Sequence, residues 1–148
     1  MSKKETLRDK NKSVHKLTDF PKVLWINLDR FTDRKTYMEE QFSYWEILDH
    51  HRISGVDGVE YEEYLKGTVP DNMNSGECAC VMSHLNAIKY FVEKTDLDEI
   101  IIMEDDVDLD TARHWNFTWK EVRKRLPINF DCLQLTIINP NGITLKLH

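Results

Sequence analysis

The chain has 148 residues and a formal net charge of −6, and hydrophobic residues make up 41% of it. The length suits one compact domain and the composition supports a packed core, so a wholly disordered chain is excluded and a second domain is disfavoured. The negative charge disfavours nucleic acid and anionic membranes as partners. We expect no membrane insertion, because no apolar run approaches the length of a membrane span.

The N-terminal segment differs in charge from the rest of the chain. Residues 1–19 carry six lysines and arginines against three carboxylates, whereas the whole chain is acidic. The segment also lacks the apolar core of a signal peptide. We therefore expect residues 1–20 to form a basic flexible leader, or a short helix, ahead of one domain at 21–148.

The three cysteines, Cys78, Cys80 and Cys132, give an odd count. This pattern predicts free thiols in a reducing compartment, and hence a cytoplasmic protein. Together with His84, the first two cysteines also suggest zinc. However, residues two apart on a helix point about 200° from one another, so both thiols cannot bind one ion while the helix is intact.

Strands and helices are expected to alternate along the chain. A run of branched and aromatic residues predicts a strand at 22–28, and a helix is expected at 34–46. Further strands are predicted at 51–53, 100–103, 133–138 and 143–147, with a turn at 139–142 and a helix at 115–125. This order favours an α/β layered domain with a largely parallel sheet and one antiparallel strand pair at an edge.

The clearest helix is predicted at 75–94, with Ser75 as its cap. Apolar residues recur there at helical spacing and are expected to face the core: Cys78, Val81, Met82, Leu85, Ile88, Phe91 and Val92. His84 lies beside this stripe, on a flank shared with Glu77 and Cys80. It is either a proton carrier or ligand-positioning group, or a core histidine with satisfied nitrogens.

Three consecutive carboxylates, Glu104, Asp105 and Asp106, follow the apolar strand at 100–103. If the backbone stays extended, Glu104 and Asp106 share one face and Asp105 points away. Two carboxylates on one face favour a hard cation such as Mg²⁺ or Mn²⁺, with Asp106 as the direct ligand and Asp105 in a structural role. The alternative is an ordinary acidic loop.

Arginines follow the end of the first predicted strand, which closes with Asn27 and Leu28. Arg30 and Arg34 could bind phosphate, since guanidinium groups are planar and permanently charged. Alone, they would be read as solvated residues. If the two strands are parallel neighbours, however, the arginines and the carboxylates meet at one rim, which suits a nucleoside diphosphate held through a cation.

Five stretches of the chain form a recognisable series in this order: VLWINLDRFTDRKTYME (23–39), SGVDG (54–58), SGECACVMSHLNAIKYF (75–91), IIIMEDDVDL (100–109) and FDCLQL (130–135). Together they resemble the family 25 glycosyltransferases, which include lipooligosaccharide and collagen hydroxylysine galactosyltransferases. The resemblance implies a GT-A-like (Rossmann-like) fold, a UDP-sugar donor (commonly UDP-galactose or UDP-glucose) and Mn²⁺ or Mg²⁺. It also implies transfer to a saccharide or hydroxylysine acceptor with inversion, as in lipopolysaccharide biosynthesis or collagen glycosylation.

The resemblance also assigns roles to residues of this chain. The nucleoside and its phosphates would contact the end of the first predicted strand, the residues that follow it and the SGVDG stretch, with Glu104, Asp105 and Asp106 as the metal motif. The implied donor contacts are Asn27, Leu28, Arg30, Arg34, Asp57, Gly58, Ser83 and His84. Candidates for the base that inversion requires are His84 and Asp105.

Two departures from the family pattern qualify this expectation. Ala79 replaces a glycine of the helix motif, and the chain ends at His148, where family members continue. We therefore expect a donor-binding half, truncated at its C-terminus. The alternatives are a truncated, non-catalytic relative that binds nucleotide sugar and, less favoured, a Mg²⁺-dependent phosphate enzyme.

Overall fold

A computed structural model describes residues 13–60, 62 and 73–135. Its centre is a parallel sheet in the order β2-β1-β3, formed by β1 (Val23–Asn27), β2 (His50–Ser54) and β3 (Ile101–Glu104). Val23 is aligned with the first residue of each neighbouring strand, so the three strands end at the same edge. The parallel α/β layered fold expected from the sequence is confirmed.

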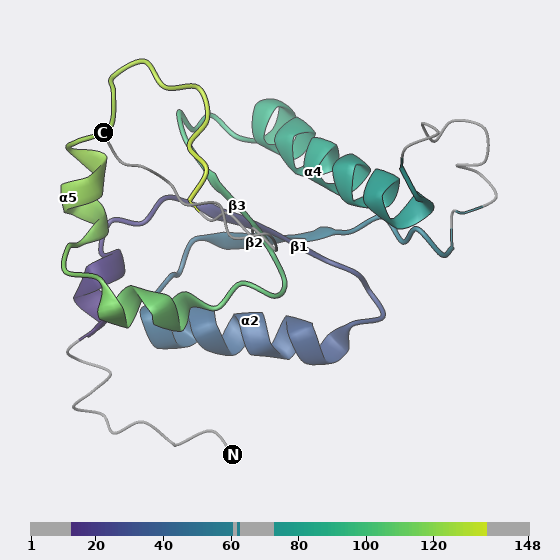
Figure 1. The fold of residues 1–148 in the computed structure, drawn as a ribbon, viewed down its shortest axis with the longest axis horizontal. Coiled ribbons are helices and arrows are strands. Elements are labelled where there is room, and N and C mark those ends of the chain that lie inside the picture. The colour runs from purple at the N-terminus through teal and green to yellow at the C-terminus, as the bar shows by residue number, and fades with distance from the viewer. Residues whose placement is uncertain (1–12, 61, 63–72, 136–148) are drawn as a thin grey trace.

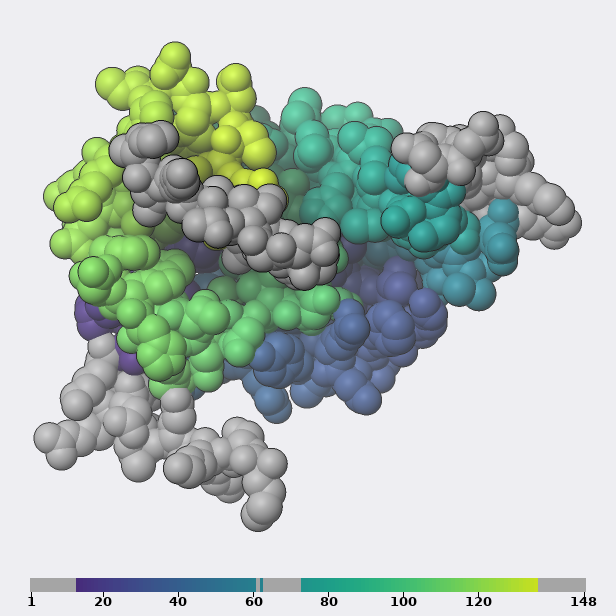
Figure 2. Space-filling model, in the orientation of Figure 1, coloured from purple at the N-terminus to yellow at the C-terminus, as the bar shows by residue number. Residues whose placement is uncertain are grey.

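Helices lie on both faces of this sheet, as Figure 1 shows. The helix α2 (Thr32–Trp45) packs on the face of Val23 and Trp25, and the helix α4 (Ser75–Lys94) covers the face of Leu24 and Ile26. The central strand is thus buried on both sides, which explains its unbroken apolar sequence. On the surface seen in Figure 2, α2 and α4 form separate ridges.

The α2 side of the sheet carries the larger core. Met38, Phe42 and Trp45 of α2 pack against Trp25. The short helices η1 (Val14–Leu17), η2 (Leu109–His114) and α5 (Trp119–Arg123) add Leu17, Leu109, Ala112 and Trp119 to the same core. The packed part of the chain therefore includes residues of the expected leader, since Leu17 is buried; residues 1–12 lie outside the described part.

The apolar stripe predicted for α4 holds for Phe91, which packs against the core on the sheet, but is wrong for most of its other large residues. The side chains that α4 buries are the small ones, Ala79, Ser83 and Ala87, which let the helix lie close to the sheet. Val81, Leu85, Ile88 and Val92 are instead exposed, at 47–71% of their surface. Counting large apolar side chains located the helix but selected the wrong face, because this contact requires small residues.

Other predictions of elements and their ends also change. Asn74, and not Ser75, caps α4, because its side chain accepts a hydrogen bond from the Glu77 backbone nitrogen while Glu77 bonds back to Asn74. The helix predicted at 115–125 begins only after Thr118, which forms the same type of capping box with Glu121. Residues 133–135 are not in a strand, and the rest of the segment 133–147 lies outside the described residues.

The helices of the described part of the chain were also compared with the length and apolarity that a bilayer requires. None of them could cross a membrane.

Candidate functional site

The carboxyl ends of the strands open onto a cavity of about 260 Å³ between the loop after β1, the loop after β2 and α4. This is the position at which parallel α/β sheets bind ligands. The cavity has one apolar part and one charged part. Its walls include Leu28, Arg30, Phe31, Arg34, Val56, Asp57, Gly58, Cys80, Ser83, His84, Glu104 and Asp105.

Asp105 links the ends of β1 and β3. One carboxylate oxygen accepts a 2.7 Å hydrogen bond from the Asn27 side-chain amide, and the other accepts a 2.8 Å bond from Arg34. The Asp105 side chain is 9% exposed, whereas that of Asp106 is 64% exposed and lies 4.0 Å from Arg34. The Asp105 carboxylate raises the pKa of Arg34, mainly through this hydrogen bond, so the guanidinium stays charged.

The expectation that Glu104 and Asp106 share a face, with Asp105 directed away, is wrong. Strand β3 ends at Glu104, and the chain turns at Asp105 and Asp106. The alternation of side chains holds only for extended backbone, so it does not apply beyond Glu104. Asp105 turns inward to Asn27 and Arg34, while Asp106 remains open to solvent.

Asn27 also joins Asp105 to β2. Its side-chain oxygen accepts a 2.9 Å hydrogen bond from Arg52, which additionally pairs with Asp29. Hydrogen bonds from Arg52 and Ser54 lower the pKa of Asp29, so this carboxylate remains ionised. Asn27 is therefore a buried connector between the three strand ends.

The loop after β2 is fixed to both neighbouring elements. Arg30 contacts Asp57 at 2.9 Å, and the Ser83 hydroxyl accepts a 2.8 Å bond from the Val56 backbone nitrogen. Gly58 lies so close to the start of α4 that a Cβ atom there would be 2.8 Å from the Ser75 carbonyl oxygen. A side chain at this position would displace the loop, since that contact is with backbone.

A second group of polar side chains lies on the α4 wall of the cavity. His84 Nε2 is 3.2 Å from Glu104 Oε1, and the Cys80 thiol is 3.9 Å from the same oxygen. Burial, reinforced by the nearby Glu104 carboxylate, raises the pKa of Cys80 and favours its neutral thiol. Glu77 does not join this group, because its carboxylate completes the cap of α4.

Comparison with known proteins identifies the family. Residues 20–141 match the pattern of the family described as glycosyltransferase family 25 (LPS biosynthesis protein). The chain belongs to glycosyltransferase family 25. No curated protein and no solved structure gives a significant match to it. Family 25 membership makes the chain a glycosyltransferase by class, and it confirms the resemblance seen in the sequence.

In this family 25 chain, the structure brings nearly all of the residues singled out in the sequence to one cavity. The exceptions are Asn27, which is buried behind the cavity wall, and Asp106, which lies outside the residues that line it. Sequence reasoning missed Arg52 as the partner of Asn27 and Phe31 as an apolar wall residue. Arg52 could have been found from the β1–β2 register, which places it beside Trp25 and near the polar strand end.

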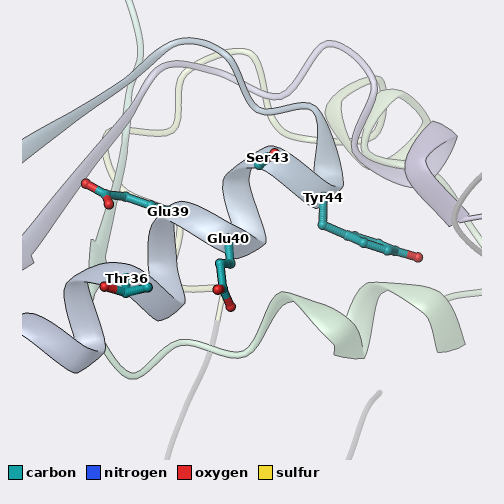
Figure 3. Close-up of a pocket in the computed structure, with 5 residues that line it drawn as sticks. All are labelled: Thr36, Glu39, Glu40, Ser43 and Tyr44. Atoms are coloured by element: carbon teal, nitrogen blue, oxygen red, sulfur yellow. The ribbon is translucent and has the colours of Figure 1, made fainter. Parts of the chain in front are cut away.

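A larger groove of about 440 Å³ lies on the outer side of α2 in the family 25 chain. Thr36, Glu39, Glu40, Ser43 and Tyr44 line it, and Figure 3 shows their side chains spreading in different directions. A binding or catalytic site requires polar side chains that converge on one point. The smaller cavity at the strand ends meets that requirement, and this groove does not.

Proposed function

We propose that this chain binds a UDP-sugar in the cavity at the strand ends and transfers its hexose, galactose or glucose, to an acceptor. The observation that carries the proposal is the meeting of the Arg30 and Arg34 guanidiniums with Glu104 and Asp105 around one cavity. Guanidinium groups pair with phosphate, and a divalent cation held by carboxylates commonly bridges to the phosphates of a nucleotide. Family 25 membership favours glycosyl transfer over the phosphate-enzyme alternative.

The two parts of the cavity suit the two parts of the donor. Leu28, Phe31 and Val56 offer an apolar wall for the nucleoside, and the arginines lie beside it. Each arginine already has a close carboxylate partner, Arg30 with Asp57 and Arg34 with Asp105, and Asp106 lies farther from Arg34 at 4.0 Å. A guanidinium has five N–H donors, so one ion pair leaves donors for phosphate oxygens. Asp57 and Asp105 thus orient the arginines, while Gly58 permits close approach of the loop.

For Mn²⁺ or Mg²⁺ we propose Asp106 as the direct ligand, with Glu104 binding through water. Both oxygens of Asp105 already accept hydrogen bonds, whereas Asp106 presents an exposed carboxylate next to Arg34. Carboxylate oxygens are the ligands these hard cations prefer. When bound, the cation would neutralise charge on the departing diphosphate.

Inversion requires a base that removes the proton of the acceptor hydroxyl. Both candidates line the cavity, and His84 is the better placed of the two, because its Nε2 contacts Glu104 at 3.2 Å. Glu104 would orient the ring and stabilise the imidazolium formed after proton transfer. Asp105 is occupied by Asn27 and Arg34, which suits a positioning role. The acceptor we propose is a saccharide or hydroxylysine hydroxyl.

The test is UDP release from UDP-galactose and UDP-glucose with Mn²⁺, first without and then with candidate acceptors. We expect release by the wild type and a loss of about 10²–10⁴-fold in His84→Gln, the range typical of a general base. His114→Gln removes an exposed histidine and serves as the control. Donor binding without release under any condition would instead establish the non-catalytic alternative, a nucleotide-sugar-binding relative.

A further inference from the structure

Three side chains with different ligand atoms converge where α4 meets the end of β3. The Cys80 sulfur, the His84 imidazole and a Glu104 oxygen all lie within 4.8 Å of one another. Among the described residues, this is the group of at least three such side chains close enough to hold a metal ion. Cys80 and His84 are four residues apart, so they share one flank of the helix.

Two of the three separations between the ligand atoms are close to those around a tetrahedral ion. Metal bonds of about 2.0–2.3 Å place neighbouring tetrahedral ligand atoms about 3.3–3.8 Å apart. The nitrogen of His84 is 3.2 Å and the sulfur of Cys80 3.9 Å from Glu104 Oε1. Small side-chain adjustments, without unwinding of α4, would therefore place one ion within bonding distance of all three.

The types of ligand atom indicate which ion the group would hold. Thiolate and imidazole favour Zn²⁺ and similar transition metals, whereas Mg²⁺ and Mn²⁺ favour carboxylates and water. The three residues also line the cavity, so a fourth position would face it. Three protein ligands with one open position are typical of catalytic zinc sites, while structural sites have four.

We propose that Cys80, His84 and Glu104 form a transition-metal site of the Zn²⁺ class, with one coordination position directed to the cavity. Cys78 takes no part, as expected from its position on the helix, and Glu104 supplies the third ligand that the sequence pattern lacked. The site does not require UDP-sugar binding, but it shares Glu104 with the cation site proposed at Asp106 and His84 with the proposed catalytic base. An ion bound here would therefore compete with the role proposed for His84 as the base.

Cobalt titration of the full chain tests the site by absorption spectroscopy. We expect one Co²⁺ per chain, with the intense visible bands of a four-coordinate ion and a thiolate-to-cobalt charge-transfer band. Cys80→Ser should remove the charge-transfer band and weaken binding by more than about tenfold, since even outer-shell changes weaken metal sites by that factor. Cys78→Ser is the matched control and should keep both the band and the affinity.

Two results would overturn the site: wild-type protein without a charge-transfer band, or a band that persists in Cys80→Ser. The first would leave only an ion pair between His84 and Glu104. Asp106→Asn separates this site from the proposed donor site. It should lose metal-dependent UDP binding while keeping the cobalt spectrum. The two measurements therefore show separately whether the donor-site proposal or the Zn²⁺-class proposal fails. Circular dichroism on each variant verifies folding.

Discussion

The Asn27 amide donates a 2.7 Å hydrogen bond to the buried carboxylate of Asp105, seventy-eight positions later in the chain. This bond joins the ends of two neighbouring parallel strands, β1 and β3. It also fixes Arg34, which contacts the other oxygen of Asp105. The middle residue of the acidic cluster is therefore part of the framework, whereas the Asp106 side chain is exposed.

Removing the Asp105 carboxylate should destabilise the fold. Asp105→Ala leaves the buried Asn27 amide and Arg34 without this acceptor, which costs about 1–3 kcal/mol in the free energy of unfolding. Asp106→Ala is the control and should change that free energy by less than about 0.5 kcal/mol, because the side chain is exposed. Urea denaturation of both variants measures the difference. Equal losses in the two would contradict the division of roles.

Gly58→Ala should displace the loop after β2. The added Cβ would lie 2.8 Å from the Ser75 carbonyl oxygen and 2.9 Å from the Gly76 Cα. We expect a loss of about 1–3 kcal/mol in unfolding free energy, because backbone on both sides must move. At Gly55 the Cβ would meet the Leu28 and Ile26 side chains at 3.1 and 3.3 Å and backbone, at Asn27, only at an ordinary 3.5 Å, so Gly55→Ala should cost less than about 1 kcal/mol. Thermal or urea unfolding of both variants measures the two losses. A larger loss in Gly55→Ala than in Gly58→Ala would contradict this prediction.

The two faces of α4 give a third test of stability. Leu85→Gln changes an exposed side chain and should alter the unfolding free energy by less than about 0.5 kcal/mol. Ala87→Leu adds volume where α4 meets the sheet and should cost about 1–3 kcal/mol. If Leu85→Gln proved the more damaging change, the face predicted from the sequence would be the buried one after all.

How much of the structure could be predicted depended on the kind of sequence pattern. Continuous apolar runs identified β1 and β3, and their parallel arrangement placed Asn27 and Asp105 at one edge. The sequence could not reveal which carboxylate turns inward, because this depends on where β3 stops and on the donors supplied by Asn27 and Arg34. Both of these are tertiary properties.

The α4 face was missed for a different reason. A periodicity of large apolar residues normally marks the buried side of a helix. Here the sheet accepts Ala79, Ser83 and Ala87, whose small size permits close packing and whose weak hydrophobic signal is easily overlooked. Cys80 and His84 reach Glu104 only because this small-residue face sets the rotation of the helix.

Stability should also fall at mildly acidic pH because of His50, whose ring stacks on Phe42. Burial lowers the pKa of His50 from its usual 6.5, so the folded state holds the neutral ring. Above about pH 6.5, His50 is neutral in both the folded and the unfolded chain. Below that pH, His50 binds a proton more readily in the unfolded chain than in the folded one. The folded state is therefore destabilised as pH falls from about 7 towards about 5.

Melting temperatures across this range test the assignment. His50→Gln should flatten part of the decline that the wild type shows, whereas His114→Gln, at an exposed position, should leave it unchanged. Parallel pH profiles for wild type and His50→Gln would show that another group is responsible.

The most direct test of the donor site is calorimetric titration with UDP, with and without Mn²⁺. Wild-type protein should bind UDP at least about tenfold more tightly with Mn²⁺, a difference of about 1.4 kcal/mol. Asp106→Asn should lose that gain, while Asp33→Asn, which removes an exposed carboxylate beside Arg34 in the sequence, should keep it. Equal UDP affinity with and without Mn²⁺ in the wild type, or an undiminished Mn²⁺ effect in Asp106→Asn, would contradict the account.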